Sequence, residues 1–301
     1  MCGIVGLFLK QPGLQSRLGE MLAPMLLAMS ERGPDSAGFA VYRQGVAAGE
    51  SKLTLFHAEA EFDWPTLIGE LRQADFAARL VDHRASHSVL AVAGPADSAA
   101  QWLGRRHPEI ECMSAGRTME IYKEVGRPAE VVERFHLADF SGTHALGHTR
   151  MATESAVTTQ GSHPFSTGAD LCLVHNGSLS NYHRLRRDLT RQGIVFRTEN
   201  DSEVAAGYLT ARLRSGASLQ QALQSSLAEL DGFYTFAVGT ADGFAVLRDP
   251  IACKPAVLAE TADWVAMGSE YRALAGLPGV AAARIWEPEP GRVYGWSRGA
   301  A

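Results

Sequence analysis

The sequence predicts an α+β domain in which antiparallel sheets and helices form layers. Three observations support this prediction. A short apolar run at the N-terminus is typical of a buried strand, the middle of the chain carries helical periodicity, and the C-terminal part consists of short apolar runs separated by Gly, Asp or Pro turns. Strands, helices and strands in this order favour antiparallel sheets over the strand–helix alternation of a parallel fold.

Strand signals occur towards both ends of the chain. Residues 3–9 are apolar and include two glycines, which indicates a strand buried on both faces with close backbone approach at the glycines. A breaker-rich loop at 31–38 leads into the next expected strand. The remaining strands are expected at 39–42, 46–57, 118–124, 145–150, 171–175, 233–238, 244–247, 256–258, 264–267 and 292–296.

Helical signals dominate between these strands. Pro24 should disturb the first helix, and Asn200 or Thr198 can cap the helix that opens at Asp201. The stretch from about 60 to 110 is the least regular part, although its beginning has a helical pattern. Helices are expected over 14–30, 63–80, 128–137 and 181–192, from 201 onward, and over 218–230.

Composition and charge exclude several classes of protein. With 301 residues, 46% of them hydrophobic, the chain can bury a sizeable core as one large domain or two small ones. A net charge of −5 makes nucleic acid an unexpected partner. Four scattered cysteines without a CxxC pair fit a reducing compartment. Because no apolar stretch reaches membrane-spanning length and the start lacks a cationic signal region, we expect a cytoplasmic protein with no membrane contact.

Cys2 is the first candidate catalytic residue. If Met1 is removed, Cys2 carries both a thiol and a free α-amine. An α-amine ordinarily titrates near ~7.7–8.0, so it can accept a thiol proton near neutral pH. The alternative is a small buried hydrophobe at the start of a strand, which a lone cysteine would favour.

Two polar segments follow predicted strands and could assist a thiolate that attacks an amide, since such a reaction needs oxyanion donors and charged groups for the substrate. Arg150 ends a strand and its planar fork matches a carboxylate, although a single Arg is more often a surface ion-pair partner. Asn176 offers a side-chain amide and Gly177 a backbone N–H, although an Asn-Gly pair alone is more often a tight turn.

Asp201 and the histidines complete the set of candidates. Asp201 could receive an ammonium group, or simply lie in the first turn of a helix, where the helix dipole favours a carboxylate. The pairs His83/His87 and His144/His148 lack the glutamate of a metalloprotease helix, so we expect no metal site.

Taken together and in this order, these pieces resemble the class II glutamine amidotransferase domain, an N-terminal-nucleophile hydrolase. Weaker similarity continues through Ser269-Glu270-Tyr271, so the resemblance spans nearly the whole chain. The motifs that carry it are Met-Cys-Gly-Ile-Val-Gly at 1–6, Arg-Gly-Pro-Asp-Ser-Ala-Gly at 32–38, His-Thr-Arg at 148–150, His-Pro-Phe at 163–165, Val-His-Asn-Gly at 174–177 and Asn-Asp-Ser-Glu at 200–203.

The resemblance implies a fold and a catalytic centre. The fold is the four-layer αββα sandwich of antiparallel sheets. Cys2 would attack the side-chain amide of glutamine, and Asn176 and Gly177 would form the oxyanion hole. Ammonia would leave, and water would hydrolyse the γ-glutamyl thioester to glutamate. The mature chain should therefore begin at Cys2.

The resemblance also implies how the substrate is held. Arg150 would bind the α-carboxylate of glutamine, Asp201 its α-amino group, and Thr153 would belong to the loop that closes over it. Met151 and Glu154 depart from the residues of several relatives, so loop closure is expected to differ.

The expected organisation is one amidotransferase domain over 2–301, with an extended insertion at about 50–115 that forms an added lobe or docks a partner. We expect no attached synthase, isomerase or flavin domain. The leading hypothesis is therefore a glutaminase subunit that passes ammonia to glutamate-synthase-like partner subunits, of which N-methylglutamate synthase is the nearest type. No cofactor is expected in this chain, and FMN would belong to a partner.

Two alternatives remain open from the sequence. The chain could be a stand-alone N-terminal-nucleophile amidase or γ-glutamyl hydrolase, or a non-catalytic regulatory subunit. The oligomeric state is not determined by the sequence, and both homo- and hetero-oligomers are compatible with it.

Overall fold

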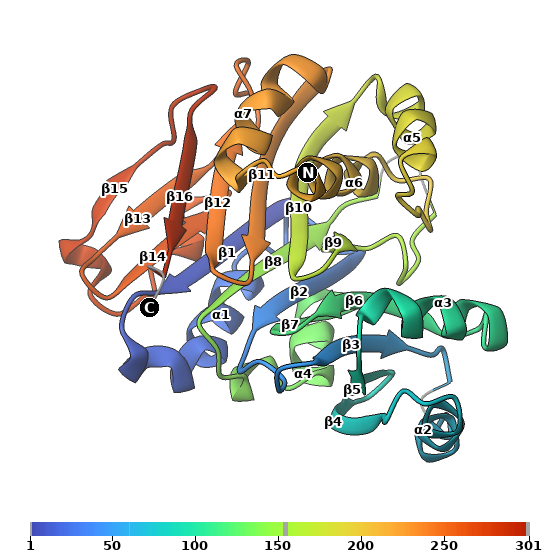
Figure 1. Cartoon of the computed structure of the whole chain (residues 1–301). Coiled ribbons are helices and arrows are strands. Elements are labelled where there is room, and N and C mark those ends of the chain that lie inside the picture. Colours follow the sequence, from blue (N-terminus) through green and yellow to red (C-terminus); the bar gives the residue numbers. More distant parts are fainter. Residues whose placement is uncertain (1, 60, 153–155, 299–301) are drawn as a thin grey trace.

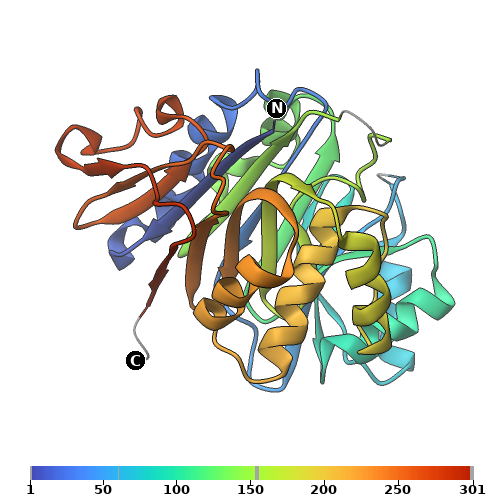
Figure 2. The same ribbon diagram turned by 90° about the horizontal axis from the view of Figure 1, so that it is seen from above.

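Two antiparallel sheets stack face to face at the centre of the molecule, and helices cover their outer faces (Figures 1 and 2). The computed structural model describes residues 2–59, 61–152 and 156–298. The layered α+β prediction is confirmed, and the order helix, sheet, sheet, helix is the αββα sandwich that the resemblance implied.

The first sheet has seven strands. Their spatial order is β15 (Arg284–Trp286), β13 (Val257–Glu260), β14 (Trp264–Gly268), β1 (Gly3–Leu9), β8 (His144–Arg150), β2 (Ser36–Tyr42) and β7 (Met119–Val125). Helices α1 (Leu18–Leu27) and α4 (Pro128–Arg134) pack on its outer face. The N-terminal strand thus lies in the middle of this sheet, between β14 and β8.

The second sheet has five strands. Their order is β16 (Val293–Ser297), β12 (Gly243–Arg248), β11 (Gly232–Thr240), β10 (Leu171–Leu179) and β9 (Phe165–Gly168). Helices α6 (Asp201–Arg214) and α7 (Leu219–Glu229) cover it, and α5 (Tyr182–Arg191) lies beside α6 (Figure 2).

Strand β1 is buried on both faces, as predicted, because its side chains alternate between two cores. Val5 and Leu7 belong to the core beneath α1. Ile4 and Phe8 belong to the core between the sheets, where the ring of Phe8 lies 6.2 Å from that of Phe244 on the other sheet. The sheets are therefore joined by packing that runs directly beneath the N-terminus.

Residues 50–116 form a separate lobe with its own core (Figure 1). That the lobe is an addition to a more compact family domain stays a prediction. A buried ion pair of 2.8 Å between Lys52 and Glu120 ties it to the seven-stranded sheet. Its elements are β3 (Glu50–Phe56), α2 (Trp64–Gln73), β4 (Arg79–Arg84), β5 (His87–Ala93), α3 (Ala96–Arg106) and β6 (Glu111–Gly116).

Two predicted helices were too long. The helix expected over 63–80 ends at Gln73, because Asp75 and Ala77 adopt left-handed backbone conformations that stop it and turn the chain into β4. The helix expected over 14–30 begins at Leu18 after a 3₁₀ segment and continues past Pro24 to Leu27. Among the residues that the structure describes, no helix combines the length and apolarity needed to cross a bilayer.

Replacing Phe8 by alanine should destabilise the sandwich strongly. Phe8 is almost fully buried between the sheets, and a large-to-small change of this kind costs about 3–5 kcal/mol of the free energy of unfolding. Ile251→Ala is the matched control, because Ile251 is 68% exposed and its removal should change that free energy by less than about 0.5 kcal/mol. Urea unfolding measures both, and equal midpoints for the two variants would contradict the packing described.

Candidate active site

Cys2 immediately precedes β1, and side chains from two other segments hold its main chain. Its carbonyl oxygen accepts hydrogen bonds from Nε of Arg32 at 2.9 Å and from Nδ2 of Asn176 at 3.1 Å. Its Sγ lies 3.9 Å from the carbonyl oxygen of Met151, and the residue is partly exposed. The backbone of Cys2 is therefore fixed while its thiol stays accessible.

Gly3 explains how Cys2 comes so close to β8. Gly3 is paired with Thr149, and a Cβ on Gly3 would lie 2.7 Å from Cβ of Met29 and 2.8 Å from Oγ1 of Thr149. A side chain at Gly3 would therefore push β1 away from β8. The close approach brings Cys2 to the end of β8 that carries Arg150.

Arg150 is the last residue of β8 and is 6% exposed. Its Nη1 donates to the carbonyl oxygen of Ala156 at 3.3 Å, and its own carbonyl oxygen accepts from the backbone N–H of Asp35. The planar guanidinium has the geometry that can pair with a carboxylate.

Asn176 and Gly177 lie inside a strand, so the tight-turn alternative is wrong. The strand expected to end at His175 continues to Leu179, because β11 pairs with it along its whole length. Gly177 has a φ of +151°, and a Cβ there would lie 2.0 Å from the carbonyl oxygen of Phe233. Glycine is thus required beside Asn176, whose side-chain amide is buried against Cys2.

Asp201 begins α6, as predicted, and Asn200 caps that helix by accepting from the N–H of Ser202 at 2.9 Å. One oxygen of the Asp201 carboxylate accepts from the N–H of Leu179 at 2.8 Å. This bond joins the start of α6 to the end of β10, two residues beyond Gly177. Asp201 is 21% exposed, so its carboxylate remains accessible to a ligand.

Three buried histidines lie near these residues: His148 and His163 contact each other, and the ring of His175 packs against Phe236 and bonds Ser202 of α6. The rings of His148 and His163 stack with centroids 3.9 Å apart, and Nε2 of His148 donates to the carbonyl oxygen of His175. Burial lowers the pKa of His148 to about 3 and that of His163 well below its usual range. Burial also lowers the pKa of His175, although Asp201 opposes that shift. All three are therefore neutral near pH 7.

Sequence reasoning missed the roles of Arg32, Asp35 and Glu270, although all three stand in motifs that carry the resemblance. Nη1 of Arg32 forms an ion pair of 2.6 Å with Glu270, and the hydrogen bond from Arg32 lowers the pKa of the Glu270 carboxyl. The carboxylate of Asp35 accepts from the N–H of Ala152 at 2.8 Å. Arg32, paired with Glu270, thus holds the backbone of Cys2, and Asp35 holds the backbone of Ala152.

Two residues named from the sequence, Thr153 and Glu154, lie outside the described residues. The described part of that loop begins with Met151, whose side chain is 45% exposed. No group of His, Cys, Asp and Glu that could hold a metal ion occurs within the described ranges.

The comparison with known proteins identifies the family. A family model described as "Glutamine amidotransferase domain" matches residues 148–276. The "Glutamine amidotransferase-like protein GlxB" of Rhizobium meliloti is 56% identical, and the match covers 98% of each chain. The chain belongs to the class II glutamine amidotransferase family. Members of this family use glutamine as the source of ammonia, and this chain is an enzyme of that class.

Other relatives agree with this assignment. A "Putative glutamine amidotransferase" of Methanothermobacter thermautotrophicus is 32% identical over 98% of this chain and 99% of that protein. The solved glutamine phosphoribosylpyrophosphate amidotransferase of B. subtilis superimposes on 98% of the chain with a TM-score of 0.62 at 21% identity. The chain spans about half of that structure, 47% of its length, and shares its N-terminal-nucleophile hydrolase fold.

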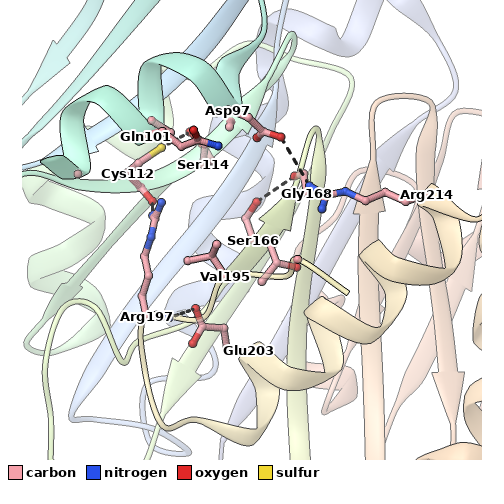
Figure 3. A pocket seen from close by; sticks show the side chains of 15 residues that line it. Asp97, Gln101, Cys112, Ser114, Ser166, Gly168, Val195, Arg197, Glu203 and Arg214 are labelled. Atoms are coloured by element: carbon pink, nitrogen blue, oxygen red, sulfur yellow. Dashed lines mark hydrogen bonds and ion pairs between the residues drawn. The ribbon is translucent and has the colours of Figure 1, made fainter. Parts of the chain in front are cut away.

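A cavity of about 350 Å³ lies apart from this site, at the junction of the lobe and the five-stranded sheet (Figure 3). Nη1 of Arg197 crosses the junction to the carbonyl oxygen of Cys112, and the backbone N–H of Arg197 donates to Glu203 at 2.9 Å. Arg214 and Asp97 form an ion pair of 3.7 Å across the junction. Of the predicted site residues, the five that the structure describes do not line this cavity, so it is not where glutamine is expected to bind.

Proposed function

We propose that the chain is the glutaminase subunit of a multi-subunit amidotransferase, and that Cys2 is its nucleophile. The arrangement around the Cys2 carbonyl carries this proposal: Asn176 and Arg32 fix the main chain of a partly exposed thiol. At the same end of the sandwich lie a buried arginine, Arg150, and an accessible carboxylate, Asp201. These charges match the two ends of a free amino acid.

The first half of the proposed reaction releases ammonia. The α-amine of a Cys2 freed of Met1 takes the thiol proton, and the thiolate attacks the amide carbon of glutamine. The side-chain amide of Asn176 has two N–H donors, and one of them is engaged with the Cys2 carbonyl. The other N–H, together with the backbone N–H of Gly177, stabilises the oxyanion. Collapse of the intermediate breaks the C–N bond, and the proton from the amine leaves with ammonia.

The second half restores the enzyme. Water attacks the γ-glutamyl thioester, the α-amine of Cys2 accepts a proton from that water, and the C–S bond breaks to give glutamate and the free thiol. Throughout, Arg150 would hold the α-carboxylate and Asp201 the α-ammonium, while Thr153 would close over the substrate. Fixing both charged ends aligns the amide carbon with Sγ.

The proposed receiver of ammonia is a separate glutamate-synthase-like subunit, N-methylglutamate synthase being the nearest type, acting in the cytoplasm. Ammonia released into water at neutral pH becomes ammonium and ceases to be a nucleophile, so a partner must collect it. The match with this chain covers 98% of the length of one relative and 99% of another. These two relatives therefore have few residues outside the matched part. FMN, if the assembly uses it, would lie in a partner.

Cys2→Ala should abolish glutamate release from glutamine, by at least about 10⁴-fold, because the nucleophile is lost. A glutamine-analogue electrophile should add to the wild-type protein and not to the variant, as intact mass reveals. Cys253→Ala is the control, because it removes an exposed thiol and leaves Cys2 in place. Equal rates for Cys2→Ala and the wild type, or Met1 retained on the active enzyme, would contradict the mechanism.

Arg150→Lys and Asp201→Asn should raise KM for glutamine about 10- to 100-fold with a smaller effect on kcat, since a charge-assisted hydrogen bond contributes about 1.5–3 kcal/mol. Asparagine retains the oxygen that accepts from the N–H of Leu179, so the fold around residue 201 should persist. Asp188→Asn, on the exposed side of α5, is the matched control. Steady-state kinetics with glutamine and Nα-acetylglutamine test the assignment. Equal turnover of the two substrates would instead indicate a stand-alone amidase.

The partner should copurify from the native host with a chain tagged at its C-terminus, because an N-terminal tag would block the α-amine of Cys2. Mass spectrometry identifies the associated chains, and their addition should raise the glutaminase rate of the isolated chain. The Cys2→Ala variant should capture the same chains. Recovery of the chain alone, with full glutaminase activity, would contradict the subunit assignment.

A further inference from the structure

Lys123 on β7 is a buried lysine whose ammonium group is bonded to main-chain oxygens. It is 4% exposed, and its Nζ donates to the carbonyl oxygens of Gln160 at 3.0 Å, Ser162 at 2.8 Å and Pro164 at 3.3 Å. The ring of Phe165 lies 4.8 Å from Nζ. Three donors thus meet three acceptors from one short segment, and no carboxylate of the described residues lies within ion-pair distance of Nζ.

The segment that Lys123 holds forms part of the surroundings of Arg150. A Cβ built on Gly161 would lie 3.7 Å from Nη1 of Arg150, so the backbone of this segment passes beside the guanidinium. Its continuation, His163, stacks on His148 of the strand that carries Arg150. The segment connects the loop that follows Arg150 to β9. Its position therefore limits where the Arg150 guanidinium can lie.

We propose that Lys123 is a positioning residue, whose charged ammonium group holds residues 160–164 in place and thereby keeps Arg150 aligned for the α-carboxylate of glutamine. This inference rests on the proposed role of Arg150. Lys123 touches no reacting atom and acts through the backbone of the segment.

The alignment of Arg150 should therefore depend on pH. A neutral amine has two N–H donors and cannot supply all three carbonyl oxygens. Burial lowers the pKa of Lys123 to about 7, with Glu203 and Glu111 opposing that shift and Arg197 adding to it. Among the described residues, His87 and His163 also face Lys123, and burial lowers the pKa of each. The histidines are neutral where Lys123 titrates, so this step belongs to the lysine.

The expected loss of local order at residues 160–164 with rising pH has the opposite sign to the effect of Lys123 on the overall free energy of unfolding. The pKa of Lys123 in the folded protein lies below the ordinary value of 10.5, so the unfolded chain binds more protons between about pH 7 and 10.5. The contribution of Lys123 to the free energy of unfolding therefore rises with pH across this interval. A loss of glutamine affinity over the same interval cannot be attributed to global unfolding caused by this group.

Hydrogen exchange of the wild-type protein tests the first part of the proposal. Peptides that cover 158–165 should lose protection between about pH 6.5 and pH 8.5, relative to peptides from β12 that serve as an internal reference for the chemical exchange rate. In Lys123→Met, the same peptides should be poorly protected at both values. Unchanged relative protection in the wild type would overturn the proposal, whatever the enzyme's substrate proves to be.

Steady-state kinetics test the link to glutamine. In the wild type, KM for glutamine should rise on the order of 5-fold between about pH 6.5 and pH 8.5, the effect of one lost hydrogen bond. Lys123→Met should show the higher KM at both values with kcat little changed, and Lys123→Arg should keep the lower KM to higher pH. Lys52→Met is the control. It removes a buried lysine that bonds Glu120 and not residues 160–164, so it should retain the wild-type profile of KM. A KM profile of Lys123→Met that matches the wild type would overturn the proposal, whereas failure of Arg150→Lys to change KM would refute the proposed function instead.

Discussion

The site depends on one carbonyl oxygen, that of Cys2, which accepts hydrogen bonds from two sides. One donor is Arg32, which lies in the segment before β2, a strand of the seven-stranded sheet. The other is Asn176, which lies on β10 of the five-stranded sheet. A residue next to a chain terminus ordinarily has a poorly ordered backbone. Here the two donors, and the ion pair of Arg32 with Glu270, hold it between the two central layers. A nucleophile at the end of the chain can therefore be as well placed as one inside a strand.

The rigidity of that arrangement comes from the packing beneath it. Strand β1 is the central strand of its sheet, and its alternate side chains enter two different cores. Close packing of this kind resists displacement, because each buried side chain makes many contacts that a shift would lose. Gly3 lets the strand approach β8, and Gly177 lets β10 approach β11 beside Asn176. Gly3 thus brings the residue after Cys2 close to β8, and Gly177 keeps the strand pairing beside Asn176.

The sequence allowed the local elements to be predicted where one local signal dominates. The apolar run of β1 and the Asn200 cap of α6 are examples, whereas the loop expected over 31–38 is shorter, because β2 already begins at Ser36. Where pairing with a distant strand determines the local structure, the prediction was wrong. Strand β10 continues past Asn176 because β11 pairs with it. Strand β4 replaces the end of a predicted helix because β5 pairs with it. The bonds of Lys123 to a segment about 40 residues away belong to this second class, and no local pattern indicates them.

The pKa values of the buried histidines bear on which group can serve as the base. A general base works best when its pKa is near the working pH, and burial lowers the pKa of His148 to about 3. His163 is shifted in the same direction, and His175 is hydrogen-bonded through Nδ1 to Ser202. The carboxylate of Asp35 is already engaged with the N–H of Ala152. These considerations favour the α-amine of Cys2, whose ordinary pKa lies close to neutral. Removal of Met1, which frees this amine, is therefore favoured by the low pKa values of His148 and His163 as well as by the family to which the chain belongs.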